Sequence, residues 1–361
     1  MRILNVAEKN DAAKNISFQL SSGNVQKREG LSVFNKIYEF DFTFQNRPSR
    51  MSMTSVSGHL MEFAFPPEYK NWSSIDPVSL FDAPITKNVA DNFLKIKETL
   101  IREVRQSDCL IIWTDCDREG ENIGMEIVQV CRSVKPNIRV LRAQFSEITK
   151  QAVTRSMQNL LEVDERVSNA VDVRQELDLR IGASFTRVQT LRLRRAFPTN
   201  LDSNVISYGP CQFPTLGFVV ERFREVDQFV SEPFWKLQCN VKKEESVNEF
   251  HWTKGNLFDK DVCEAFYSAL MENPNGYILS VVKKPKSRWR PAAMDTVELE
   301  KLSSTKLRLT AKETMHIAEK LYTQGYISYP RTETNIFPKE IDLKKLVQEQ
   351  GQDNRWSGQL S

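Results

Sequence analysis

The sequence lacks several patterns that assign proteins to common classes. Its six cysteines form no CxxC pair, so it offers neither a zinc knuckle nor a thioredoxin-type redox motif. No stretch of eighteen apolar residues occurs, and the N-terminus shows neither a signal-peptide nor a transit-peptide pattern. The phosphate-binding loop GxxxxGK[ST] is also absent. We therefore expect free thiols in a reducing compartment, no membrane segment, and no nucleotide site of the P-loop type.

Length and net charge limit only weakly the number of domains and the kind of partner that the chain can have. The chain has 361 residues, which is too long for one ordinary core, so several domains are expected. Lys and Arg number 50 against 47 Asp and Glu, which gives a formal net charge of +3. Basic residues gather at 192–195 and at 283–290. Each cluster suits a phosphate backbone but taken alone is more typical of a solvated face, so charge does not identify a partner.

The first part of the chain alternates between strand and helix patterns. We expect strands at 2–8, 36–44, 49–56, 109–114 and 138–145, and helices at 9–20, 118–134 and 147–161. The run CLIIWT at 109–114 is continuously apolar, which indicates a buried central strand. Ser146 is expected to cap the helix that follows it. This alternation predicts an α/β domain with mostly parallel strands.

The rest of the chain changes character twice. Residues 160–200 are helical in pattern, and SYGPCQFPTLGFVVERF opens as a Gly/Pro turn and closes as a helix. Alternation typical of β-structure appears from about 228 to 285, including GYILSVV, and helices return from about 292. We therefore predict a multidomain α/β and α+β protein with an α/β domain, a helical domain, a β-rich domain and a second helical domain, at 1–155, 156–225, 226–290 and 291–361.

Acidic residues cluster where the buried strand ends. Asp115 and Asp117 follow that strand and Glu119 starts the next helix, while Glu8 and Lys9 end the first strand. In a parallel sheet these strand ends share one edge, where α/β folds bind ligands. Carboxylates this close repel unless a cation holds them, and an oxygen ligand set favours Mg²⁺.

The acidic cluster also partly matches two different patterns. DCDREGENIGME partly fits an EF-hand loop, but such a loop is entered from a helix and this one follows a predicted strand. Acids also gather at helix N-termini because of the helix dipole, which accounts for one or two of them.

The motif YPR at 329–331 suits a second kind of chemistry, which is nucleophilic attack by a tyrosine. A tyrosine hydroxyl has a pKa near 10, so it attacks only where cations stabilise the phenolate and the group under attack. Arg331 offers a planar fork that suits phosphate oxygens. Tyr329 taken alone is more typical of a half-buried aromatic with a satisfied hydroxyl.

Two resemblances join these features. A Glu after one strand and Asp-x-Asp-x-Glu after another resembles the Toprim domain of type IA and type II topoisomerases, bacterial primases and some nucleases. A second resemblance is to the active-site segment of type IA DNA topoisomerases, carried by LTAKETMHIAEKLYTQGYISYPRTET. Its Tyr-Pro-Arg resembles the sequence found in the topoisomerase III branch, and the motifs taken together resemble the eukaryotic alpha type. Similar motifs follow the family's order along the chain: VAEKN, MTSVSGHL, LFDAP, WTDCDREGENIG, RQELDLRIGASFTR, SYGPCQFPTLGFVVERF and RPAAMDTVELEKL.

The resemblance implies an N-terminal Toprim domain, followed by helical and β-rich arch domains, and a specific reaction. Tyr329 would attack single-stranded DNA and form a 5′-phosphotyrosyl link, and the freed 3′-hydroxyl would later reverse the step. Arg331 would hold the phosphate, and Lys9 would stabilise or protonate the leaving 3′-oxygen. The resemblance implies that Mg²⁺ is held by Glu8, Asp115, Asp117 and Glu119. It implies that DNA is bound by Arg174, Asp178, Arg180, Arg187, Ser207, Gln212 and Thr215.

The resemblance also implies a setting. The enzyme would be nuclear, relax negative supercoils, decatenate DNA in recombination and repair, and work with a RecQ-family helicase and an OB-fold accessory protein. The family continues well beyond its tyrosine, so we expect this chain to be a C-terminally truncated form. Two alternatives stay open: another Toprim enzyme such as a primase or nuclease, and a non-catalytic protein that binds single-stranded DNA. His59, in SGHL, fits either a functional residue or a residue that packs the core.

Overall fold

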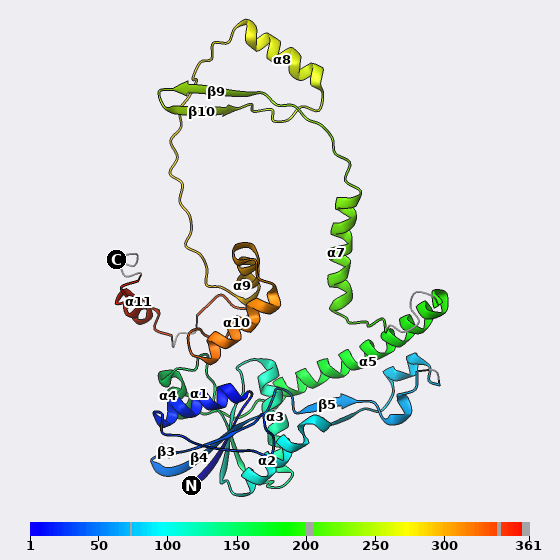
Figure 1. Cartoon of the computed structure of the whole chain (residues 1–361), viewed down its shortest axis with the longest axis vertical. Coiled ribbons are helices and arrows are strands. Elements are labelled where there is room, and N and C mark those ends of the chain that lie inside the picture. Colours follow the sequence, from blue (N-terminus) through cyan, green and yellow to red (C-terminus); the bar gives the residue numbers. More distant parts are fainter. Residues whose placement is uncertain (73, 199–204, 338–340, 356–361) are drawn as a thin grey trace. The chain divides into compact units, whose positions relative to one another are not determined.

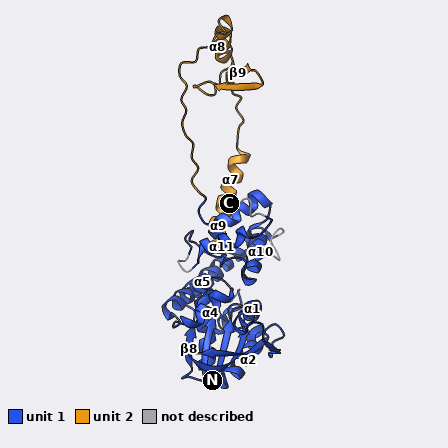
Figure 2. Ribbon diagram, turned by 90° about the vertical axis from the view of Figure 1, so that its left-hand side faces the viewer, with its two compact units in different colours: residues 1–210, 291–361 blue, residues 211–290 orange. Residues whose placement is uncertain are grey.

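The computed structural model describes residues 1–72, 74–198, 205–337 and 341–355. These residues form two compact units, shown in Figure 2. Unit 1 combines Met1–Pro210 with Pro291–Ser361, and unit 2 is Cys211–Arg290. Segments separated by the whole of unit 2 in the sequence therefore belong to one body. The four-part division predicted from the sequence stays a prediction.

A six-stranded sheet is the centre of unit 1 (Figure 1). Its strand order is β2-β3-β4-β1-β7-β8, and β1 pairs in parallel with both β4 and β7, while β7 pairs in parallel with β8. The other pairings, β2 with β3 and β3 with β4, are antiparallel. The strands are β1 (Arg2–Ala7), β2 (Gln26–Arg28), β3 (Ile37–Phe44), β4 (Arg47–Ser55), β7 (Cys109–Trp113) and β8 (Arg139–Arg142).

A tight hairpin explains the antiparallel part of the sheet. Strands β3 and β4 are joined by Gln45 and Asn46, which both have positive φ (48° and 62°). Two positive φ values in a two-residue loop are typical of a type I′ turn, whose twist matches that of the flanking strands. The parallel strands, in contrast, are linked by helical crossovers.

Alternate residues of the central strands feed two separate cores. Cys109, Ile111 and Trp113 of β7 lie in one cluster, and Leu110 and Ile112 lie in the other. This period-two division places helices on both faces of the sheet, as expected for a buried parallel strand. The first cluster includes side chains of α1 (Asn10–Ser21), α4 (Lys150–Gln158) and α10 (Ala311–Thr323), and the second includes side chains of α2 (Leu94–Arg105) and α3 (Arg118–Arg132).

Helices, short strands and turns around the sheet complete unit 1. The long helix α5 (Glu165–Ala196) is capped by Asp164, whose side chain accepts from the amide of Arg166, and it packs along α3. Helix α10 begins with a capping box formed by Thr310 and Glu313, which fixes its first turn. The remaining elements are β5 (Met61–Ala64), β6 (Thr86–Val89), the 3₁₀ turns η1 (Pro67–Tyr69), η2 (Pro77–Phe81) and η3 (Asp91–Phe93), α9 (Thr296–Leu302), the π-helical turn η4 (Ser303–Leu307) and α11 (Leu343–Gly351).

Unit 2 contains two helices and one hairpin. They are α7 (Gln212–Asp227), the antiparallel pair β9 (Gln238–Lys243) and β10 (Ser246–His251), and α8 (Lys260–Glu272). Trp252 packs edge-on against Phe266, with ring centroids 5.3 Å apart, and joins the hairpin side to α8. Within the described ranges, no helix of either unit is long and apolar enough to cross a bilayer.

Two local predictions are wrong. Ser146 does not cap the next helix, because α4 begins at Lys150 and the side chain of Thr149 accepts from the amide of Ala152. The Ser146 carbonyl instead accepts the amide of Tyr329 at 2.8 Å, so a distant segment takes up this backbone position. GYILSVV (276–282) forms no strand, and its largest apolar side chains are exposed, since no strand pairs with it in the described part of the chain.

Candidate active site

Two adjacent strand ends bring the first acids together. β1 ends at Ala7 and β7 ends at Trp113, and the two are parallel neighbours with Ala7 opposite Trp113. The next residues therefore meet at one edge of the sheet: Oε2 of Glu8 accepts the amide of Asp115 at 3.2 Å. Burial and the nearby charge of Asp115 raise the pKa of Glu8 to about 7.

The loop between β7 and α3 is drawn tightly against the helix. Asp117 is the N-cap of α3, and its Oδ1 accepts the amide of Gly120 at 2.7 Å. A Cβ on Gly120 would lie 2.0 Å from the carbonyl oxygen of Asp115, so only glycine permits this close approach. The carboxylates of Asp115 and Asp117 are consequently held on one short, rigid turn.

A buried arginine stabilises the loop between β7 and α3. Arg142, at the end of β8, is 1% exposed and donates to the carbonyls of Thr114 at 2.8 Å and Asp115 at 2.8 Å. Its charge is paired with Glu121 at 3.0 Å, and Glu121 in turn accepts the amide of Asp164 at the start of α5. The guanidinium thus ties β8, the acidic loop and α5 into one arrangement.

Tyr329 lies directly against the acidic loop. Its hydroxyl donates to Oδ2 of Asp117 at 2.5 Å, although 212 residues separate the two. Burial, followed by the hydrogen bond to Asp117, raises the pKa of Tyr329 above its usual value. The hydroxyl is therefore protonated in this arrangement, and Asp117 is the group placed to take its proton.

A second tyrosine sits beside the first. Tyr322, on α10, is 3% exposed, and its hydroxyl donates to Oδ1 of Asp115 at 3.2 Å. The two tyrosine rings meet edge-on with centroids 5.2 Å apart. Burial, followed by the charge of Asp115, raises the pKa of Tyr322 well above its usual value. Tyr322 therefore docks α10 onto the acidic loop and gives Tyr329 a packed neighbour.

The turn before Tyr329 requires glycine. Gly325 has φ of +82°, and a Cβ there would lie 2.8 Å from the carbonyl oxygen of Ile148. This approach lets the chain turn against the backbone just before α4 and bring the amide of Tyr329 to the carbonyl of Ser146. The position of the hydroxyl thus depends on backbone contacts as well as on Asp117.

Arg331 and Lys9, the two cations predicted to act on the DNA phosphate, both pair with the carboxylate of Glu319. Arg331 donates from Nε and Nη2 to Oε1 of Glu319 at 2.9 and 2.5 Å, and Lys9 Nζ lies 3.7 Å from Oε2. Lys9 is also 3.9 Å from Oε1 of Glu8. Although burial opposes it, the hydrogen bond from Arg331 and the charge of Lys9 lower the pKa of Glu319. The same pairing raises the pKa of Arg331.

Glu119 points toward a neighbouring network. Its carboxylate pairs with Arg174 of α5 at 2.8 Å and with Nε2 of His59 at 3.0 Å. Nδ1 of His59 lies 3.3 Å from Oε1 of the fully buried Glu126, and Lys87 pairs with that carboxylate at 3.0 Å. The hydrogen bond that His59 donates to Glu126 raises the pKa of His59 despite burial. His59 therefore links Glu119 to a buried ion-pair network rather than only packing the core.

The acidic side chains offer the donor atoms that a hard divalent cation prefers, but they are not gathered around one point in this structure. Glu8, Asp115 and Asp117 offer only carboxylate oxygens, the donors that Mg²⁺ prefers. However, Asp117 already accepts hydrogen bonds on both oxygens. Among the residues that the structure describes, no three His, Cys, Asp or Glu side chains are grouped closely enough to hold a metal. The donor set fits, and each Asp117 oxygen keeps a further lone pair, so ligation requires the carboxylates to draw closer together.

The four predicted DNA-binding residues on α5 fall into two groups. Arg174 and Asp178 are exposed on α5 and pair with each other at 3.0 Å. Arg180 instead donates to the carbonyls of the 80–83 segment, and Arg187 donates to the carbonyl of Tyr69 at 2.7 Å. These two arginines hold Tyr69 and the 80–83 stretch against α5 and do not face open solvent as the first pair does.

The three other predicted DNA-binding residues are exposed and are divided between the units. Ser207 is in unit 1, whereas Gln212 and Thr215 begin α7 in unit 2. The hydroxyl of Thr215 donates to the carbonyl of Cys211 at 2.8 Å within the helix. The roles of these residues stay predictions.

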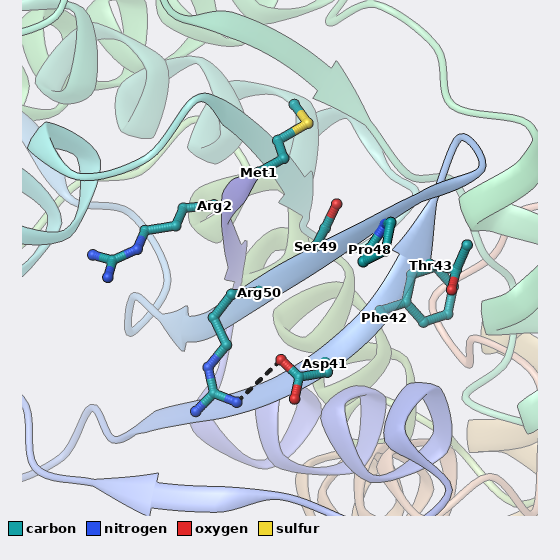
Figure 3. Close-up of a pocket in the computed structure, with 8 residues that line it drawn as sticks. All are labelled: Met1, Arg2, Asp41, Phe42, Thr43, Pro48, Ser49 and Arg50. Carbon is teal, nitrogen blue, oxygen red and sulfur yellow. Dashed lines mark hydrogen bonds and ion pairs between the residues drawn. The ribbon is translucent and has the colours of Figure 1, made fainter.

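A separate cavity lies elsewhere in unit 1 (Figure 3). It has a volume of about 540 Å³ and is lined at the opposite end of β1 and β4 by residues that include Met1, Arg2 and Arg50. Arg50 pairs there with Asp41 at 3.2 Å. The pocket is separated from the acids by the length of the strands, so it does not belong to the site.

Comparisons with known proteins agree on one group. Residues 4–148 match the family model of the Toprim domain, and residues 162–359 match a family model described as DNA topoisomerase. The chain is 58% identical over 355 residues to DNA topoisomerase 3-alpha of Homo sapiens, covering 98% of this chain and 36% of that protein. For the Drosophila melanogaster protein of the same name, identity is 56% over 358 residues, covering 99% and 29%. The chain thus spans about a third of the length of these relatives.

A solved structure supports the fold. Full-length topoisomerase I from Thermotoga maritima matches with a TM-score of 0.63 and 24% identity, over 96% of this chain and 52% of that one. The predicted α/β Toprim domain within a multidomain α/β and α+β protein is confirmed. Toprim domains typically bind a divalent metal. The EF-hand hypothesis is wrong, because β7 and not a helix enters the acidic loop.

Proposed function

This chain belongs to the DNA topoisomerase family, and from that premise we propose that it cleaves and rejoins single-stranded DNA by the type IA reaction, without ATP. One observation carries the proposal: the hydroxyl of Tyr329 lies 2.5 Å from Asp117 at the edge where Glu8 and Asp115 meet. A primase or nuclease would use the acids but has no need of this tyrosine, and a passive binding protein needs neither.

In cleavage, loss of the phenolic proton accompanies attack, because the raised pKa of Tyr329 disfavours a free phenolate. The tyrosine oxygen attacks the phosphorus of a DNA phosphodiester while Asp117 takes its proton. A new bond forms between the tyrosine oxygen and the phosphorus while the bond to the 3′-oxygen breaks. Lys9 gives the leaving oxygen a proton, and Arg331 holds the negative oxygens of the phosphate. The products are a 5′-phosphotyrosyl link and a free 3′-hydroxyl.

Rejoining reverses these steps. The 3′-hydroxyl attacks the phosphotyrosine, the tyrosine oxygen leaves with a proton from Asp117, and the diester re-forms. The link stores the energy of the broken bond, so no nucleotide is consumed. Glu8 and Asp115, with Glu119 nearby, would hold Mg²⁺, and Asp117 would join them when it does not carry the proton of Tyr329. The ion would supply positive charge that aligns the phosphate and the hydroxyl. Arg174 and Asp178, exposed on α5, would contact the strand beside the site.

The wider role follows from the relatives. The proteins that this chain resembles are named DNA topoisomerase 3-alpha. We propose relaxation of negative supercoils and decatenation of recombination intermediates in the nucleus, with a RecQ-family helicase and an OB-fold protein as partners. The names of the relatives and the similarity over 98% of this chain support this proposal.

The test is capture of the covalent intermediate. Chain and 3′-labelled single-stranded oligonucleotide are mixed with Mg²⁺ and quenched with detergent, with Tyr329→Phe as the control that removes one oxygen. We expect a labelled protein band in the wild type, none in the variant, and none with a 5′ label. Binding without any adduct, repeated in a longer form of the chain, would refute the proposal.

A further inference from the structure

Glu319 occupies a position between the two cations assigned to DNA. Its Oε1 accepts both hydrogen bonds from Arg331, and its Oε2 faces Lys9 at 3.7 Å. Each oxygen of one carboxylate therefore satisfies a different cation. A phosphodiester presents the same chemistry, because it has two non-bridging oxygens that share one negative charge, and the arginine fork binds either group.

From this geometry we propose that Glu319 is a positioning residue that stands in for the DNA phosphate. It holds Lys9 and Arg331 at the spacing that they need and competes with the incoming phosphate for both. The inference rests on the proposed function, since it assigns these two cations to the scissile phosphate. Single-stranded DNA then binds by displacing the carboxylate.

The surroundings of Glu319 favour exchange over a permanent structural pair. The side chains of Lys9 and Arg331 are 45% and 55% exposed, so both cations are open to solvent and to a ligand. Glu319 is 29% exposed and is anchored through its helix, because Tyr322, one turn later on the same face, binds Asp115. The helix stays docked when the side chain moves, so the carboxylate is released without unfolding the site.

The excess of negative charge around Glu319 also favours competition between its carboxylate and a DNA phosphate. Two cations face four carboxylates here, those of Glu8, Asp115, Asp117 and Glu319. An entering phosphate adds a further negative charge to this excess. Removing the charge of Glu319 therefore favours DNA binding, provided that its role is competition. A purely structural role predicts the opposite sign, because a loosened Arg331 would hold the phosphate less well.

The experiment measures binding apart from chemistry. Affinity for a fluorescent single-stranded oligonucleotide is measured by anisotropy in EDTA, in the Tyr329→Phe background, with and without Glu319→Gln. Exposed ion pairs are each worth up to about five-fold, so we expect binding about two- to ten-fold tighter, with the gain shrinking at high salt. Glu349→Gln, which makes the same charge change at an exposed ion pair on α11, is the matched control and should leave affinity unchanged.

A double-mutant cycle identifies the partner. The gain from Glu319→Gln should fall by at least half when Arg331 is already replaced by Gln, because the carboxylate then has less to compete for. Equal or weaker binding in Glu319→Gln, or an equal gain in Glu349→Gln, would overturn the inference. The adduct assay on the chain with Tyr329 and Glu319 intact separates the two claims: an adduct there keeps the proposed function even if this inference fails.

Discussion

Replacing Gly120 by alanine tests how the acidic loop is built. In an ordinary helix position the change gains about 0.8–1 kcal/mol from helix propensity. Here the new Cβ would lie 2.0 Å from the carbonyl oxygen of Asp115, 2.8 Å from its carbon and 3.0 Å from its nitrogen. All three atoms are backbone, so no side chain can rotate away, and the loop must move by roughly 1 Å to reach normal contact.

The cost follows from what the loop holds. Overpacking of this kind costs about 1–3 kcal/mol, and here it also pulls the Asp115 carbonyl from its 2.8 Å hydrogen bond with Arg142. The overlap outweighs the propensity gain, and we expect Gly120→Ala to lower the free energy of unfolding by about 1–3 kcal/mol. It should also reduce the covalent adduct, because Asp115 and Asp117 move together.

Urea unfolding followed by far-UV circular dichroism measures the global effect, and hydrogen exchange of the β7 amides reports the sheet itself. Gly182→Ala is the matched control on α5, where the nearest atom to a Cβ is the carbonyl oxygen of Tyr208 at 3.7 Å. It should be neutral or gain up to about 1 kcal/mol. A Gly120→Ala protein as stable as the Gly182→Ala protein would refute the close approach and the rigid turn inferred from it.

Three further substitutions test the supports of the site. Arg142→Met leaves Glu121 buried without its cation, and urea unfolding should show a loss of about 3–5 kcal/mol; a loss below 1 kcal/mol would contradict the buried pairing. Thr149→Ala removes the side-chain cap of α4 and should cost about 1 kcal/mol in thermal unfolding, whereas Ser146→Ala, which keeps the carbonyl used by the tyrosine segment, should cost little; equal losses would argue against the assigned cap. Gly325→Ala combines a positive φ with a 2.8 Å overlap, so limited proteolysis should cut the 326–331 segment faster than in the wild type, and an unchanged rate would show that the turn is not needed.

Part of the site follows directly from the sequence. Glu8 and Asp115 come after strands with clear patterns, and parallel neighbours must end at the same edge. Their contact at 3.2 Å is therefore predictable in kind from strand order alone. The continuous apolar run of β7 also predicts its central place, since it is buried along its whole length.

Other contacts depend on the fold. No spacing rule places Tyr329 against Asp117 across 212 residues; the family resemblance points to the site but not to which acid takes the hydrogen bond. Glu319 and Tyr322 lie three residues apart and so share a helix face, but the sequence does not show which face of α10 meets the sheet. The sequence does not show which group the Tyr322 hydroxyl binds, because its partner Asp115 lies in a distant segment of the chain.

The network around His59 shows the same limit. Its partners Glu119 and Glu126 lie on α3, and Lys87, which pairs with Glu126, comes from β6, so three separated segments must fold before the imidazole has a defined role. Spacing along the chain does not reveal this arrangement. The nearest signal is that Glu119 and Glu126 are seven residues apart on a predicted helix, which puts both on one face.

The most direct test of the central claim is to identify the residue that carries DNA. The adduct formed with a short single-stranded oligonucleotide is digested with nuclease and protease, and the modified peptide is sequenced by mass spectrometry. We predict a nucleotide joined through its 5′-phosphate to the oxygen of Tyr329, with no modified peptide from Tyr322 or Tyr326. Attachment at another residue, or through a 3′-phosphate, would contradict the account of the site.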